Sequence, residues 1–133
     1  MLAKQVTVFI ENREGRLCEV LEILKENDIN VVGASIADTS DFGLFRMIVN
    51  EPQKACDALK AGGIMSKLTD IISVVVPHKA GSLEKVLKVI NEAGINIEYM
   101  YGMSSQNSDA AIAIKTGDLE ATQALLEKHK LTE

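Results

Sequence analysis

The sequence predicts an α+β fold made of two tandem βαββαβ sandwiches, each an antiparallel sheet with both helices on one face. Three observations predict this fold. The sequence matches itself 66 residues further on, so that Val8 falls on Val74. Short β-branched runs alternate with apolar stripes at helical spacing. Both halves of the chain show these elements in the same order.

The internal repeat defines the expected domains, residues 1–69 and 70–133. The overlay needs no gap, and most matches fall on positions that a shared fold would bury. A single unit of this size buries little surface, so the two units should pack together. The matches pair Val8 with Val74, Gly15 with Gly81, Leu17 with Leu83, Val20 with Val86, Leu21 with Leu87, Ile29-Asn30 with Ile95-Asn96, Ile48 with Ile114, Ala55 with Ala121 and Leu59 with Leu125.

Each unit should open with a strand, at 6–10 and 71–76, because β-branched residues favour strands. A polar stretch ending at a glycine follows, and then a helix with apolar residues at i, i+3, i+4 and i+7. The first helix should end near 27–28 and the second at 93–94. The two stripes are Leu17, Val20, Leu21, Leu24 and Leu83, Val86, Leu87, Ile90.

The second half of each unit should contain two strands and a helix. Second strands are expected at 30–37 and 96–103, polar turns at 38–41 and 104–108, and third strands at 44–49 and 110–115. The second helices should begin at Pro52, which suits a first helical position, and near Asp118, which can act as an N-cap. Their expected buried faces carry Ala55 and Leu59, and Ala121 and Leu125.

The fourth strand differs between the units. A strand at 64–68 runs almost directly into the first strand of the second unit. The corresponding segment of the second unit is only 131–133 and its approach, so this strand is short, absent or supplied from elsewhere. The third strands lack polar alternation, since only Arg46 interrupts the first and nothing interrupts 110–114. A covered open face is therefore expected, most simply through a homodimer.

Composition excludes several classes of function. The net charge of −5 and the absence of a Lys/Arg cluster argue against nucleic acid as a partner. The longest strongly apolar run, 71–76, is far shorter than a membrane span, and the N-terminus does not look like a signal peptide. Cys18 and Cys56 do not form a disulfide framework, so a cytoplasmic location is expected.

The glycine loops carry a family resemblance. The first unit has Asn12-Arg13-Glu14-Gly15-Arg16-Leu17 and then Ile29-Asn30-Val31. The second has His78-Lys79-Ala80-Gly81-Ser82-Leu83 and then Ile95-Asn96-Ile97. This pattern resembles the ACT domain, twice, over nearly the whole chain. Family members often have proline before the glycine, where Glu14 and Ala80 stand here, and His78 replaces the usual Asp or Asn. The two loops therefore differ chemically, and one of them can be structural only.

The resemblance implies a ferredoxin-like fold and a regulatory function without catalysis. ACT modules bind free amino acids or similar small effectors at interfaces between paired modules, and they regulate an attached or partner enzyme. The chain would then be a stand-alone regulator or a subunit of a metabolic enzyme, with no cofactor and no metal. The implied ligand contacts are Asn12, Arg13, Glu14, Gly15, Arg16, Leu17 and Asn30 in the first unit, and His78, Ala80, Gly81, Ser82, Leu83 and Asn96 in the second.

Physical chemistry supports a carboxylate site at these loops. Gly15 and Gly81 precede helices, whose first backbone N–H groups lack internal partners and can bind an anion. Oxygens of Asn12, Asn30 or Glu14 can accept from an ammonium group. In a paired arrangement, Asn30 and its counterpart in the second unit would face a neighbouring module's loop.

Simpler interpretations stay open. The glycines can be turn residues, the two Asn can belong to helix–strand connections, and His78 can be an exposed loop residue. Cys18 has no nearby His or resolving Cys to support redox chemistry, and no catalytic constellation is evident. A metal carrier would need Cys-x-x-Cys, and an RNA binder would need a basic face with exposed aromatics. A dimerising interaction module without a ligand is the main alternative.

Overall fold

The computed structural model describes residues 2–11, 14–38, 42–105 and 109–131. The parts of the expected turns at 39–41 and 106–108 lie outside the described residues. The α+β content and the antiparallel strand pairing are confirmed. In chain order the elements are β1 (Leu2–Glu11), α1 (Arg16–Glu26), β2 (Val31–Asp38), β3 (Phe42–Val49), α2 (Pro52–Ala61), β4 (Ser66–Val76), α3 (Ser82–Glu92), β5 (Ile97–Met103), β6 (Ala110–Thr116) and α4 (Leu119–Lys128).

The chain divides into two compact units, and two strands take part in both. The first unit is Lys4–Thr69, and the second comprises the described residues of Asp70–Glu133 together with Leu2 and Ala3. Strand β1 therefore contributes its first residues to the second unit and the rest to the first. Strand β4 continues without interruption from the first unit into the second.

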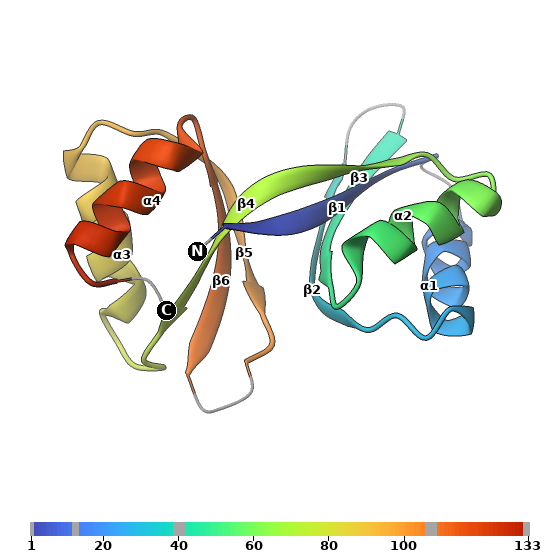
Figure 1. Ribbon diagram of the computed structural model, residues 1–133, viewed down its shortest axis with the longest axis horizontal. Coiled ribbons are helices and arrows are strands. Elements are labelled where there is room, and N and C mark those ends of the chain that lie inside the picture. Colours follow the sequence, from blue (N-terminus) through green and yellow to red (C-terminus); the bar gives the residue numbers. More distant parts are fainter. Residues whose placement is uncertain (1, 12–13, 39–41, 106–108, 132–133) are drawn as a thin grey trace. The chain divides into compact units, whose positions relative to one another are not determined.

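The first unit has the strand order β4-β1-β3-β2. Strand β3 pairs antiparallel with β1 on one side and β2 on the other. The Phe9 N–H donates to the Met65 carbonyl over 3.1 Å, which brings the start of β4 alongside β1. Helices α1 and α2 lie on the same side of these strands (Figure 1). The buried core is Val6, Val8, Ile10, Val20, Leu24, Ile29, Phe45, Met47, Val49, Ala55, Leu59 and Ile64.

The second unit completes its sheet with the beginning of the chain. Strand β6 pairs antiparallel with both β4 and β5. Strands β1 and β4 are hydrogen-bonded neighbours, and Leu2 and Ala3 belong to this unit, so they occupy the place of a fourth strand. Helices α3 and α4 lie on one side of the strands (Figure 1). The buried core is Ile72, Val74, Val76, Val86, Ile90, Ile112, Ile114 and Leu126.

The register of the strands corrects the gap-free overlay in its second half. Val8 faces Phe45 in the first unit, whereas Val74 faces Ile112 in the second. Corresponding residues of the two units are thus 66 positions apart in the first strands, β1 and β4, but 67 positions apart in the third strands, β3 and β6. The second unit has one more residue between its second and third strands. The structural counterpart of Ile114 is therefore Met47, which faces Ala34 as Ile114 faces Met100.

The same shift corrects the buried face of α4. Ala121 is exposed and Leu125 is half-buried, whereas Thr122 and Leu126 are fully buried. The prediction for α2 is confirmed, since Ala55 and Leu59 are fully buried. Thr122 stands where Ala55 does, and its hydroxyl pairs with that of Thr116 over 2.8 Å. This hydrogen bond satisfies two buried hydroxyls, those of Thr116 and Thr122, which stand where the first unit has Val49 and Ala55.

Candidate functional site

The second glycine loop connects β4 to α3 through a left-handed turn. Gly81 has φ 88° and ψ −13° and is the N-cap of α3, and no side chain of the described residues caps the helix with a hydrogen bond. The Lys79 N–H donates to the Pro77 carbonyl over 2.9 Å, and the Ser82 N–H to the Lys79 carbonyl over 3.3 Å. A side chain at Gly81 would meet no atom within 4 Å, so its backbone angle, and not crowding, requires glycine.

The first turn of α3 retains unpaired amide donors. The first helical hydrogen bond runs from the Lys85 N–H to the Gly81 carbonyl over 3.1 Å. Among the described residues, the amides of Leu83 and Glu84 have no acceptor. Unpaired donors of this kind, together with the positive end of the helix dipole, attract a carboxylate.

Two pockets open beside this loop, so the bend is not sealed. One, of about 390 Å³, is lined by His78, Ala80, Leu83 and the β6 residues Ala110 and Ile112, among others. The other, of about 350 Å³, is lined by residues that include Gly81, Lys85 and Leu131. Both are within the size range of small-ligand sites, which is roughly 300–1,000 Å³.

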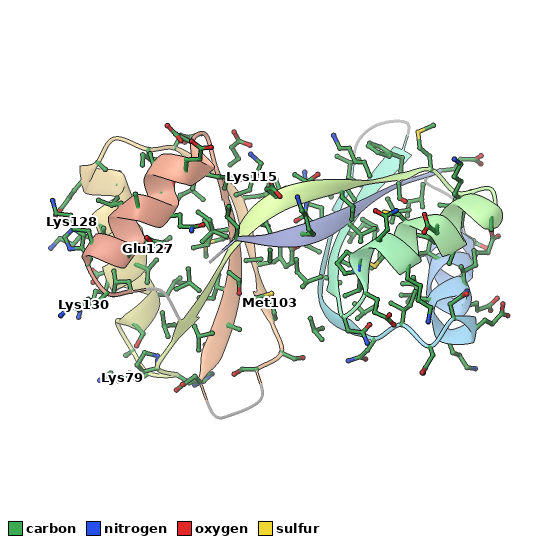
Figure 2. The ribbon with its side chains drawn as sticks, in the orientation of Figure 1. Lys79, Met103, Lys115, Glu127, Lys128 and Lys130 are labelled. Atoms are coloured by element: carbon green, nitrogen blue, oxygen red, sulfur yellow. The ribbon has the colours of Figure 1, made fainter. Side chains whose placement is uncertain are left out.

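Positive charge gathers around the second loop. Lys79 lies on the loop before α3, and its side chain extends outward (Figure 2). Lys79 lines both pockets, His78 lines the first and Lys85 the second. Glu84 in the first helical turn is the nearby acidic residue of α3. The arrangement favours an anionic group over a cationic one.

The first glycine loop has the same backbone and a different set of charges. Gly15 has φ 84° and ψ −15° and is the N-cap of α1. Arg16, which replaces Ser82, forms an ion pair with Glu19 over 2.5 Å, and its Nε is buried without a hydrogen-bond partner in the described part of the chain. Glu14 is exposed, Leu17 is half-buried, and Asn12 and Arg13 lie outside the described residues.

The structure does not bring the two asparagines to the glycine loop of their own unit. Asn30 and Gly15 lie at opposite ends of α1, an 11-residue helix about 16 Å long. The Asn30 amide donates to the Asn50 side chain over 3.0 Å, and the Asn50 amide donates to the Asn30 carbonyl over 3.2 Å. In the second unit, Asn96 lines a separate pocket with Asn91 and Gly94. These asparagines can meet a glycine loop only in another module.

Sequence reasoning missed several residues of the second loop site. Pro77 and Val76 line both pockets, and Lys85 and Leu131 line one of them. Lys85 lies four residues after Gly81, one helical turn along α3, so its place beside the loop was readable from spacing. The contributions of Ala110, Ile112 and Leu131 depend on tertiary structure and leave no local sequence signal.

The comparisons with known proteins identify the family. A family described as the ACT domain pair matches residues 1–132. The chain therefore belongs to the ACT domain pair family. Among curated protein sequences, none matches this chain.

Solved structures share this fold across the whole chain. The crystal structure of protein BT0572 from Bacteroides thetaiotaomicron is 37% identical, with a TM-score of 0.92, and the match covers 99% of this chain and 91% of that one. The regulatory subunit of aspartate kinase from Thermus thermophilus, in its ligand-free form, is 20% identical, with a TM-score of 0.66 and coverages of 100% and 96%. The corresponding subunit from Thermus flavus is 21% identical, with a TM-score of 0.62 and coverages of 96% and 92%.

No helix in the described part of the chain is long and apolar enough to cross a membrane. The same residues contain no group of three or more His, Cys, Asp or Glu side chains that could hold a metal ion.

Proposed function

We propose that the chain is a regulatory protein that binds a free amino acid, or a similar small effector, and catalyses no reaction itself. Membership of the ACT domain pair family and a fold shared with regulatory subunits of aspartate kinase support this function. The observation that carries it is the second glycine loop, where unpaired amides of α3 adjoin two open pockets. The α-carboxylate would bind the amides of Leu83 and Glu84.

The two loops are proposed to differ in affinity. The second loop has Lys79, Lys85 and His78 near its open amides, which favours a carboxylate. At the first loop, Glu19 already engages the Arg16 guanidinium. An ammonium group would need an acceptor such as Asn30 or Asn96 from a paired module. This requirement supports a homodimer in which the ligand lies at a module interface.

The partner is proposed to be a metabolic enzyme whose activity the effector controls. The aspartate kinase subunits with this fold are regulatory subunits by name, and this chain is proposed to act in the same way on a catalytic partner. Cys18 and Cys56 are both free thiols, which suits a reducing cytoplasm.

A thermal-shift screen of the whole chain against the twenty common amino acids tests this function. A specific ligand binds the folded state and should raise the unfolding midpoint, by an amount that grows with concentration. Gly81→Val should abolish the rise in midpoint that comes from binding at the second loop, because a β-branched residue cannot adopt the left-handed turn without strain. Gly15→Val is the matched control and should spare it. The amino-acid hypothesis fails if no amino acid shifts the midpoint and calorimetry detects no heat of binding.

A further inference from the structure

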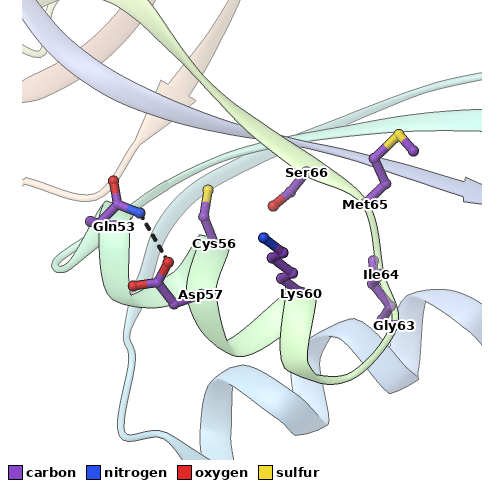
Figure 3. A pocket seen from close by; sticks show the side chains of 8 residues that line it. All are labelled: Gln53, Cys56, Asp57, Lys60, Gly63, Ile64, Met65 and Ser66. Atoms are coloured by element: carbon purple, nitrogen blue, oxygen red, sulfur yellow. Dashed lines mark hydrogen bonds between the residues drawn. The ribbon is translucent and has the colours of Figure 1, made fainter.

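A pocket of about 580 Å³ lies in the first unit, and none of its lining residues belongs to a glycine loop. It is formed by α2, the turn after it and the start of β4. We call it the α2 groove, and its lining residues are Gln53, Cys56, Asp57, Lys60, Gly63, Ile64, Met65 and Ser66 (Figure 3). Its volume falls within the range of small-molecule sites, roughly 300–1,000 Å³.

A polar stripe of α2 forms one wall of the α2 groove. Gln53, Cys56, Asp57 and Lys60 recur at i, i+3, i+4 and i+7, so they share one helix face. This face adjoins the buried stripe of Ala55 and Leu59, and Cys56 packs against the core of the unit. The wall is therefore held by a rigid element, with its polar groups turned to the groove.

The wall carries separated groups of opposite charge. At one end, Gln53 Nε2 donates to Asp57 Oδ1 over 3.0 Å, which orients the carboxylate and leaves its second oxygen available. Toward the other end, the ammonium of Lys60 and the hydroxyl of Ser66 converge on the space between α2 and β4 (Figure 3). The ammonium group of Lys60 has no hydrogen-bond or ion-pair partner among the described residues.

Apolar surface completes the α2 groove. Ile64 is buried, its amide donating to the Leu59 carbonyl over 2.8 Å, which fixes the turn after α2. Met65 is 71% exposed at the rim, although it is a large apolar side chain. A flexible thioether beside a pocket can cover an apolar ligand group.

The second unit has no such arrangement at the equivalent positions. With the 67-residue offset, Gln53, Asp57 and Lys60 correspond to Glu120, Ala124 and Glu127. Glu127 accepts from Gln123 Nε2 over 3.2 Å, within an acidic stripe that lacks a cation. The charge pattern of the α2 groove is thus a property of the first unit and not a requirement of the fold.

We infer that the α2 groove is a second effector site, which binds a zwitterionic amino acid with an aliphatic or thioether side chain. Lys60 and Ser66 bind the carboxylate, the free oxygen of Asp57 accepts from the ammonium, and the side chain packs against Cys56, Ile64 and Met65. This site is independent of the glycine loops. The chain would then respond to amino acids at two chemically different places.

Cysteine alkylation reports on this site directly, because the two thiols mark different places. Cys56 lines the α2 groove, whereas Cys18 lies in the first turn of α1, next to the Gly15 loop. The full chain is treated with N-ethylmaleimide, with each of the twenty amino acids at millimolar concentration, and each thiol is followed by peptide mass spectrometry. We expect at least one apolar amino acid to slow alkylation of Cys56 several-fold while Cys18 reacts at an unchanged rate.

Two lysines of α2 give matched variants. Lys60→Gln should abolish the protection of Cys56, and Asp57→Asn should weaken it, since each removes one charge that the zwitterion needs. Lys54→Gln should preserve it, because Lys54 lies outside the α2 groove and its ion pair with Glu51, at 3.6 Å, is exposed. Circular dichroism checks that all three variants fold.

Several results would overturn the inference. It fails if no amino acid protects Cys56, or if the protection survives in Lys60→Gln. A third result would also overturn it: an amino acid raises the unfolding midpoint but does not protect Cys56, and the rise in the midpoint disappears in Gly81→Val. That result would uphold binding at the second glycine loop. Failure of the α2 groove and failure of the proposed function are therefore separate results.

Discussion

The glycine loops show what individual residues determine in this protein. Gly15 and Gly81 were predicted as glycine bends before helices, and both are left-handed N-caps with open space around them. The chemistry at each loop was less predictable. The Arg16–Glu19 ion pair depends on side-chain conformations, and the contributions of Ala110 and Leu131 to the second loop's pockets depend on tertiary structure, neither of which a one-dimensional pattern encodes. Sequence reasoning therefore located the loops without ranking them.

A pair of alanine substitutions separates backbone strain from loss of flexibility. Gly81→Ala should destabilise the protein by about 1–2 kcal/mol, because a Cβ disfavours the left-handed conformation. Gly117→Ala is the control, since Gly117 also has open space around it but no positive φ. That substitution should be neutral or stabilise by about 0.4–1 kcal/mol. Urea unfolding midpoints provide the measurement, and equal effects of the two substitutions would contradict the argument.

At the scale of elements, the sequence predicted the buried face of a helix correctly where the apolar periodicity and the identities between the two repeats agreed. The apolar stripes predicted α1 and α3, and Val20, Leu24, Val86 and Ile90 are their buried residues. It failed in α4, where the identity of Ala121 to Ala55 favoured the wrong register. A residue inserted between β5 and β6 shifts every later position by one, and burial of Leu126 selects the true helix face. Identity at single positions is a weaker guide than the periodicity of burial.

Helices α2 and α4, the second helix of each unit, differ in their N-caps, and this difference can be tested. Asp118 accepts a hydrogen bond from the Ala121 amide over 3.0 Å, whereas Glu51 makes no side-chain cap. Asp118→Ala should therefore cost about 0.5–2 kcal/mol of unfolding free energy. Glu51→Ala should change it by less than about 0.5 kcal/mol, as is usual for an exposed residue without such a role. Chemical denaturation of both variants gives the comparison, and a loss in Glu51→Ala as large as that in Asp118→Ala would contradict it.

At the scale of the whole molecule, β1 and β4 each contribute residues to both units. Sequence reasoning anticipated that the fourth strand of the first unit runs almost directly into the next strand, and β4 is one continuous strand. It left three alternatives for the last strand of the second unit. The answer, Leu2 and Ala3 of β1, joins residues about seventy positions apart in sequence. Such long-range pairing depends on tertiary structure and leaves no periodic signal.

Because Leu2 and Ala3 of β1 belong to the second unit, we expect that shortening β1 destabilises the second unit. Deletion of Leu2 and Ala3 removes main-chain partners from the β4 edge of the second unit and leaves the β1–β3 pairing, which starts at Val6, intact. Hydrogen exchange should therefore speed up in α3, β6 and α4 while β3 keeps its protection. Replacing both residues by serine retains the backbone and is the control. Because Leu2 is 43% exposed, the serine variant should lose much less protection than the deletion. If exchange rose equally in β3, or if the serine variant matched the deletion, the main chain of β1 would not be what completes the second sheet.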